Sequence, residues 1–191
     1  MLFGRIPAST KPFGFLASLL TAALCVTPAL ADPADVLPPG PKQSLAKIVG
    51  DDQNALAALL AATHSAEEWH TQLSADAHGL DDNQIAALAD YLAYNVPPPN
   101  PVSGDSATAK IEALPPDGRE LFLNSCFSCH GVEAYYLTQN RDQAGWMSLF
   151  DAPYHRRLLT GDNERETFAS YATHAMPIAT DAVPAEWRDK K

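Results

Sequence analysis

The sequence Cys126-Phe127-Ser128-Cys129-His130 limits what this chain can fold into more than any other feature. Two cysteines separated by two residues and followed directly by a histidine form a C-x-x-C-H motif, which is typical of covalent haem attachment. Each thiol can form a thioether with one vinyl group of the porphyrin, and the adjoining imidazole can bind the iron from the same side. We therefore predict one haem c, attached through Cys126 and Cys129, with His130 as an iron ligand.

Other interpretations of the cysteine pair have less support. A thioredoxin-like redox pair is expected next to a βαβ pattern, and no such pattern surrounds the motif. A structural zinc site has four ligands, usually with a second pair of cysteine or histidine residues. The only further cysteine is Cys25, which lies in a segment that we expect to be removed. A disulfide between Cys126 and Cys129, or a different metal site, stays open as an alternative.

Residues 1–31 have the composition of a secretory signal peptide. Basic residues near the start precede an apolar run over 13–26, which is short for a membrane span. Ala29-Leu30-Ala31 is typical of a signal-peptide cleavage site. We predict an exported protein whose mature chain begins at Asp32 and contains no membrane-spanning segment.

The chain is acidic, because 23 Asp and Glu residues against 13 Lys and Arg residues give a formal net charge of −10. Loss of the basic signal segment makes the mature chain more negative still. Such a surface repels the phosphates of nucleic acids, so we predict no nucleic-acid partner. It can steer the chain towards a basic patch on a partner protein, although a role in solubility alone is equally consistent with the composition.

Composition and helix-start signals predict an all-α fold. Capping-box patterns occur at Ser65 with Glu68 and at Asp117 with Glu120, as expected where helices begin. Apolar residues over 85–92 recur with helical spacing, whereas the proline-led segment that follows is typical of a linker. We predict four parts: a signal peptide (1–31), a small helical module (32–96), a linker (97–110) and a haem module (111–191).

The two predicted modules share a sequence pattern. In each, a tryptophan is followed by an acidic helix start, a tyrosine and an X-Pro pair, and the spacing from tyrosine to X-Pro is the same. The matched residues are Trp69, Tyr91 and Val96-Pro97 in the first module and Trp146, Tyr171 and Met176-Pro177 in the second. We interpret this as a duplication in which the first copy carries no haem, because it contains no cysteine. Chance similarity among Ala- and Leu-rich helices stays open.

The region around the motif resembles the class I c-type cytochromes. Gly118 and Phe122 precede C-x-x-C-H as in the first helix of that family, and Met176-Pro177 resembles its Met-Pro pair. The resemblance implies a periplasmic protein with a cytochrome c-like helical haem domain, here preceded by a small helical domain. It also implies Met176 as the second iron ligand, since Met/His ligation raises the reduction potential. The chain departs from the family after Met176, where only a short segment remains in place of a long helix.

Other side chains are alternatives for the second axial position. His155 or His174 would give two histidine ligands and a lower potential, and Met147 lies next to Trp146. An open position is a further alternative, and it would permit chemistry on a small molecule.

The predicted function is transfer of single electrons, because an iron with two protein ligands has no position open for a substrate. The expected partner is a periplasmic dehydrogenase that donates electrons or an oxidase that accepts them, recognised through charged surfaces. The alternatives are a cytochrome subunit of a periplasmic oxidoreductase complex and a haem enzyme with an open distal site. A haem-based sensor would need a signalling segment, which the sequence does not show.

Overall fold

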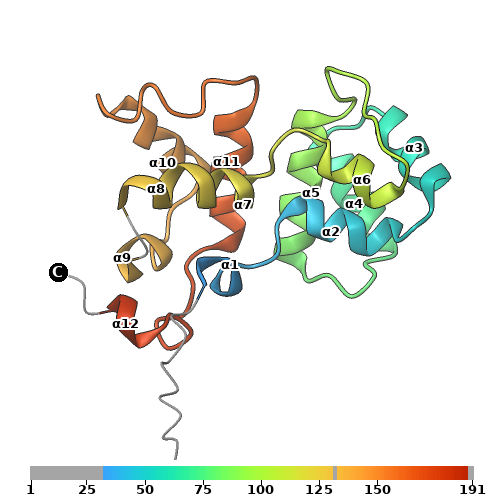
Figure 1. The fold of residues 1–191 in the computed structure, drawn as a ribbon. Helices are drawn as coiled ribbons and strands as arrows, with labels where there is room; N and C mark the ends of the chain where they lie inside the picture. The colour runs from blue at the N-terminus through green and yellow to red at the C-terminus, as the bar shows by residue number, and fades with distance from the viewer. Residues whose placement is uncertain (1–31, 131–132, 189–191) are drawn as a thin grey trace, which may run out of the picture. The chain divides into compact units, whose positions relative to one another are not determined.

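The computed structural model describes residues 32–130 and 133–188, and every regular element in this part of the chain is helical (Figure 1). The prediction of an all-α fold is therefore confirmed. The predicted signal peptide, 1–31, lies outside the described residues. No helix in this part of the chain is both long enough and apolar enough to cross a bilayer.

The N-terminal helices after the first one pack around one hydrophobic cluster, whereas Val36 in the first helix packs against the C-terminal cluster. The elements are α1 (Pro33–Val36), α2 (Pro41–Val49), α3 (Gln53–Ala61), α4 (Ala66–Ala75), α5 (Asp82–Asn95) and α6 (Ala107–Glu112). Helix α5 contacts both α4 and α2, and α2 also contacts α6. The predicted capping box begins α4, because the Ser65 hydroxyl accepts the Glu68 N–H and the Glu68 carboxylate accepts the Ser65 N–H at 2.7 Å. The cluster runs from Leu45 to Leu114.

The C-terminal elements pack around a second cluster, with α11 in contact with several of them. They are α7 (Gly118–Leu121), a π-helical turn (Phe122–Cys126), α8 (Phe127–His130), α9 (Ala134–Leu137), α10 (Gln143–Met147), a 3-10 turn (Ser148–Asp151), α11 (Glu164–Ala175) and α12 (Ala185–Arg188). Helix α11 contacts α7 and α10. Leu37, from the start of the described chain, belongs to this second cluster.

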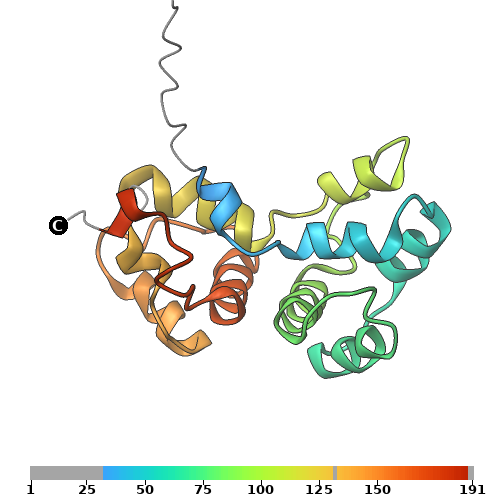
Figure 2. The same cartoon turned by 90° about the horizontal axis from the view of Figure 1, so that it is seen from below.

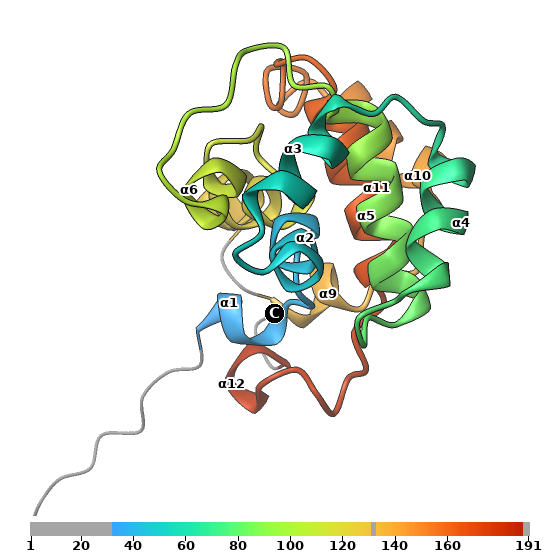
Figure 3. The ribbon, with the colours of Figure 1, turned by 90° about the vertical axis from the view of Figure 1, so that its right-hand side faces the viewer.

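Helices α5 and α11 lie side by side and join the two clusters (Figure 3). The buried Asn95 amide of α5 donates to the Thr167 hydroxyl of α11 at 2.9 Å. The Ser170 hydroxyl donates to the Asp90 carboxylate at 2.6 Å. The described residues form one compact unit, and α6 lies partly inside the predicted linker. The division into two modules stays a prediction.

Two buried tyrosines make matching contacts. The Tyr91 hydroxyl of α5 donates to the Pro115 carbonyl, just before α7, and the Tyr171 hydroxyl of α11 donates to the Pro38 carbonyl, just before α2. Both bonds measure 2.7 Å. Each of the two helices is thereby tied to the chain that enters the other cluster. Figure 2 shows α1 beside the start of α7, where the Arg119 guanidinium donates to the Ala34 carbonyl.

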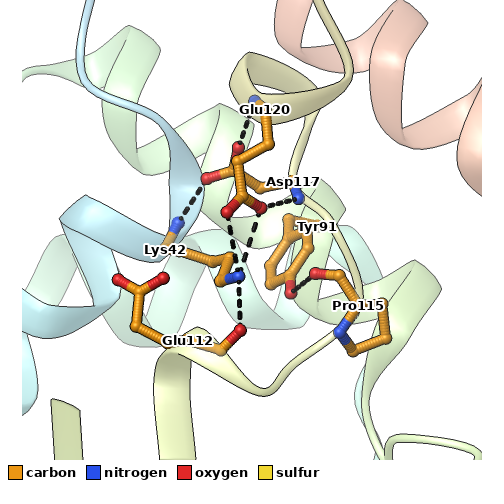
Figure 4. A network of polar contacts seen from close by, with 6 residues as sticks. All are labelled: Lys42, Tyr91, Glu112, Pro115, Asp117 and Glu120. Carbon is orange, nitrogen blue, oxygen red and sulfur yellow. Dashed lines mark hydrogen bonds and ion pairs between the residues drawn. The ribbon is translucent and has the colours of Figure 1, made fainter. Parts of the chain in front are cut away.

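A buried polar network fixes the start of α7 (Figure 4). The Asp117 carboxylate accepts the Glu120 N–H within α7 and the Lys42 N–H at the start of α2, each at 2.9 Å. The Lys42 ammonium contacts both Glu120 carboxylate oxygens at 3.1 Å and the Glu112 carbonyl at 2.9 Å. Burial raises the pKa of Asp117, although its backbone hydrogen bonds act in the opposite direction. One carboxylate therefore caps two helices, one from each cluster.

Candidate functional site

The approach to the cysteine motif is set by a close helix crossing. A Cβ atom on Gly118 would overlap the Tyr171 side chain and lie 2.6 Å from the Thr167 carbonyl oxygen, so α7 and α11 could not keep this spacing with a larger residue. The chain then makes a π-helical turn over Phe122–Cys126, where the Phe127 N–H bonds to the Phe122 carbonyl. Such turns are frequent at functional sites, and this one changes the helical register at which Cys126 follows α7.

The predicted haem-binding residues share one cavity. Cys126, Cys129 and His130 all line a space of about 510 Å³, which lies within the range of cofactor pockets, roughly 300–1,000 Å³. Most of its wall is apolar, and the residues that line it include Phe122, Phe127, Trp146, Leu149, Phe150 and Phe168. The structure therefore brings the three motif residues together beside a cavity of suitable size and polarity for a largely apolar cofactor.

Phe168, in the middle of α11, organises the aromatic wall. Its ring is stacked on Phe122, with centroids 5.7 Å apart and planes 18° apart. The rings of Trp146 and Phe150 meet it edge-on, at 6.0 and 5.7 Å. Packed aromatic pairs of this kind add about 0.5–1.5 kcal/mol of stability each beyond area burial. The sequence pattern drew attention to Phe122 and Trp146 but not to Phe150 or Phe168, because the residues of this wall come from separate elements and share no spacing in the sequence.

The cavity also has a polar side. Trp146 is 3 % exposed, and among the described residues its indole Nε1–H has no hydrogen-bond partner. Leaving such a donor unsatisfied costs about 1–3 kcal/mol. The Arg141 guanidinium carbon lies 5.6 Å from the Trp146 ring centroid, and both residues line the cavity. A cation beside an unpartnered N–H donor fits the carboxylate of an otherwise apolar ligand.

Cys126 does not have the character of a catalytic thiol. Both cysteines of the motif are free, Cys126 being half-buried and Cys129 exposed. Burial raises the pKa of Cys126 to about 12, and the neighbouring Cys129 adds to that effect. Because the thiolate is the nucleophile in redox and hydrolytic enzymes, a pKa this high disfavours the thioredoxin-like interpretation.

Two histidine rings lie close together at the cavity. His130 and His155 both line it, and their ring centroids are 5.8 Å apart with planes at 75°. The His130 Nδ1 atom is 2.8 Å from the Tyr136 hydroxyl, and the His155 Nδ1 atom is 3.0 Å from the Leu149 carbonyl oxygen. Across residues 32–130 and 133–188, no group of three or more His, Cys, Asp or Glu side chains is arranged to hold a metal ion.

Met176 is not brought to the cavity. It is the C-cap residue of α11, it is 5 % exposed, and it lines a separate pocket of about 200 Å³ together with Pro38 and His174. The His174 Nε2 atom lies 3.2 Å from the Asp90 carboxylate. Met147 packs against the second hydrophobic cluster and is not among the residues that line the cavity.

Of the side chains considered for the second axial position, His155 alone lines the cavity with His130. It lies in the turns between the 3-10 turn and α11, a position that no helix pattern marks in the sequence.

Comparison with known proteins gives no family model, no curated protein and no solved structure that matches this chain, and the residues around the cavity are the basis for assigning a function.

Proposed function

We propose that the chain is an exported monohaem c-type cytochrome that passes single electrons between periplasmic proteins. One observation carries the proposal: the two cysteines and the histidine of the motif line a single, largely apolar cavity of about 510 Å³. Haem bound there would supply a reversible one-electron couple. An unpartnered Trp146 N–H and the Arg141 guanidinium beside it support the fit, because haem carries two carboxylates on an apolar ring.

Each residue of the site would have a distinct task. The S–H groups of Cys126 and Cys129 would each add across one vinyl C=C bond to form a thioether, so that every atom is retained and no oxidant is consumed. The His130 imidazole would bind the iron through Nε2, with its Nδ1–H donated to the Tyr136 hydroxyl, since a hydrogen bond at one ring nitrogen orients the other. The phenylalanine wall would exclude water.

The first helical cluster has a supporting role in the proposal. It contains no cysteine, yet its α5 helix packs against α11, whose Phe168 forms the cavity wall. We infer that residues 32–96 are a haem-less counterpart of the haem module. They hold α11 in place and add acidic surface for docking to a basic patch on a dehydrogenase or an oxidase. The matching hydrogen bonds of Tyr91 and Tyr171 support this interpretation.

A potentiometric titration tests the electron-transfer function. The protein is produced in a host that matures c-type cytochromes and is titrated under argon while its optical spectrum is recorded. A single reversible one-electron transition per chain, with no turnover of added hydrogen peroxide, is the expected result. Rapid peroxide turnover, or a ferric form that binds cyanide as readily as an enzyme with an open site, would favour a haem enzyme instead. The Cys126→Ala/Cys129→Ala double variant is the control, and it should yield protein without covalent haem.

A further inference from the structure

The two cavity histidines have free ring nitrogens available for one metal ion. A backbone carbonyl can only accept a hydrogen bond, so the Nδ1 atom of His155 must carry the proton that it donates to the Leu149 carbonyl at 3.0 Å. Its Nε2 atom is then the nitrogen with a lone pair. Metal-binding histidines characteristically donate their second N–H to a carbonyl or carboxylate in this way. Among the described residues, the Nε2 atoms of His130 and His155 have no hydrogen-bond partner.

The separation of the two rings suits a single ion between them. With metal–nitrogen bonds of about 2.0 Å, two imidazoles on opposite sides of one metal have ring centroids roughly 6 Å apart. The observed separation is 5.8 Å. The interplanar angle of 75° is compatible with two imidazoles bound to one metal, since each ring can rotate about its own metal–nitrogen bond.

The loop that carries His155 is held from α11. The Arg165 guanidinium donates to the Arg156 carbonyl at 2.7 Å and to the Leu158 carbonyl at 3.2 Å, on the C-terminal side of His155. It also lies 4.9 Å from the Phe150 ring centroid, on the N-terminal side. His155 is therefore positioned by contacts on both sides of the loop and by its own hydrogen bond to Leu149. These contacts within the protein place it at the cavity without a bound ligand.

We propose that His155, and not Met176, is the second axial ligand of the haem iron, so that the site is a bis-histidine centre. This inference rests on the proposed haem binding. Met176 lines a different pocket with His174, and the His174 Nε2 atom is already placed against Asp90. Replacing a thioether with a second imidazole removes the ligand that raises the potential in Met/His cytochromes. The centre should therefore have a lower reduction potential than the class I resemblance implies.

The experiment compares haem-loaded wild-type protein with His155→Ala, His155→Met and Met176→Leu variants, using electron paramagnetic resonance, near-infrared magnetic circular dichroism and potentiometry. We expect a low-spin ferric bis-imidazole signature in wild-type protein and in Met176→Leu. His155→Ala should become high-spin, and added imidazole should restore the low-spin signature. His155→Met should raise the potential and show thioether ligation. His174→Ala, on the neighbouring pocket, is the matched control and should leave the signature unchanged.

A wild-type thioether signature that disappears in Met176→Leu and persists in His155→Ala would overturn the assignment. A high-spin wild-type ferric form would overturn it as well. Intact mass, measured on every preparation first, separates this inference from the proposal on which it depends. Attached haem with the wrong axial ligand refutes His155 alone, whereas bare polypeptide refutes the haem site and the bis-histidine centre together. Far-UV circular dichroism of each variant checks that helix content is retained.

Discussion

Asp117 should be among the most costly residues to replace outside the cavity. Its side chain is 2 % exposed and accepts the Glu120 N–H and the Lys42 N–H, both at 2.9 Å. Asp117→Ala removes both acceptors. Each buried donor left without a partner costs about 1–3 kcal/mol. Burial raises the pKa of Asp117, which means that the carboxylate itself is costly to bury, so its removal offsets part of the loss.

The net expectation is that Asp117→Ala lowers the free energy of unfolding by about 3 kcal/mol. Asp117→Asn should cost roughly half as much, because its amide oxygen can still cap α7 while its NH₂ group cannot accept the Lys42 N–H. Asp142 is the matched control, since it caps α10 through a single exposed bond to the Gly145 N–H at 2.7 Å. Asp142→Ala should cost about 1 kcal/mol.

Urea unfolding followed by far-UV circular dichroism measures these differences directly. The reasoning fails if Asp117→Ala is no more destabilising than Asp142→Ala. It also fails if Asp117→Asn is as damaging as Asp117→Ala, because the bond to α7 would then contribute nothing.

Three further predictions concern the helix crossing, the cavity and the contact between α5 and α11. Gly118→Ala should destabilise the fold by about 1–3 kcal/mol through overpacking, and Gly145→Ala, whose Cβ would meet only the Asp142 and Arg141 side chains, should cost less in the same urea assay. Trp146→Phe should cost the haem-free protein less than the lost ring packing alone would, because it also removes an unsatisfied buried N–H; a loss of unfolding free energy above about 3 kcal/mol would contradict this. Burial by itself would raise the pKa of Asp90, but hydrogen bonds from His174 and Ser170 lower it overall. The stabilising contribution of the Asp90 carboxylate is therefore present above the ordinary Asp pKa of about 3.9 and is lost as the pH falls through the lowered pKa. Ser170→Ala should weaken this loss of stability in acid, measured by urea unfolding at pH values of about 4 and below. An unchanged pH dependence in Ser170→Ala would show that the hydrogen bond from Ser170 does not contribute.

Much of the fold could be predicted from local sequence chemistry. A capping box satisfies backbone N–H groups within one helical turn, so it can be predicted without tertiary information. The sequence predicted both of those at Ser65 with Glu68 and at Asp117 with Glu120. The sequence could not predict that Asp117 also caps α2, because the Lys42 N–H comes from a distant part of the chain. The π-helical turn before Cys126 likewise leaves no periodic signal in five residues.

The candidate site was predictable to the extent that its chemistry is contiguous in sequence. Cys126, Cys129 and His130 are adjacent, and the structure places them on one cavity. The second histidine depends on a loop fold that no helical spacing encodes, and Met176 was favoured because its Met-Pro sequence resembles a familiar pair. The aromatic wall around Phe168 depends in the same way on packing between separate elements.

Intact-mass spectrometry of the protein exported from a host with c-type maturation machinery tests the central claim most directly. The account predicts a chain that is heavier than its mature polypeptide by one haem, with the added mass retained after denaturation and absent from the Cys126→Ala/Cys129→Ala variant. Protein of bare polypeptide mass with both thiols open to alkylation, isolated alongside a correctly matured reference cytochrome, would contradict it.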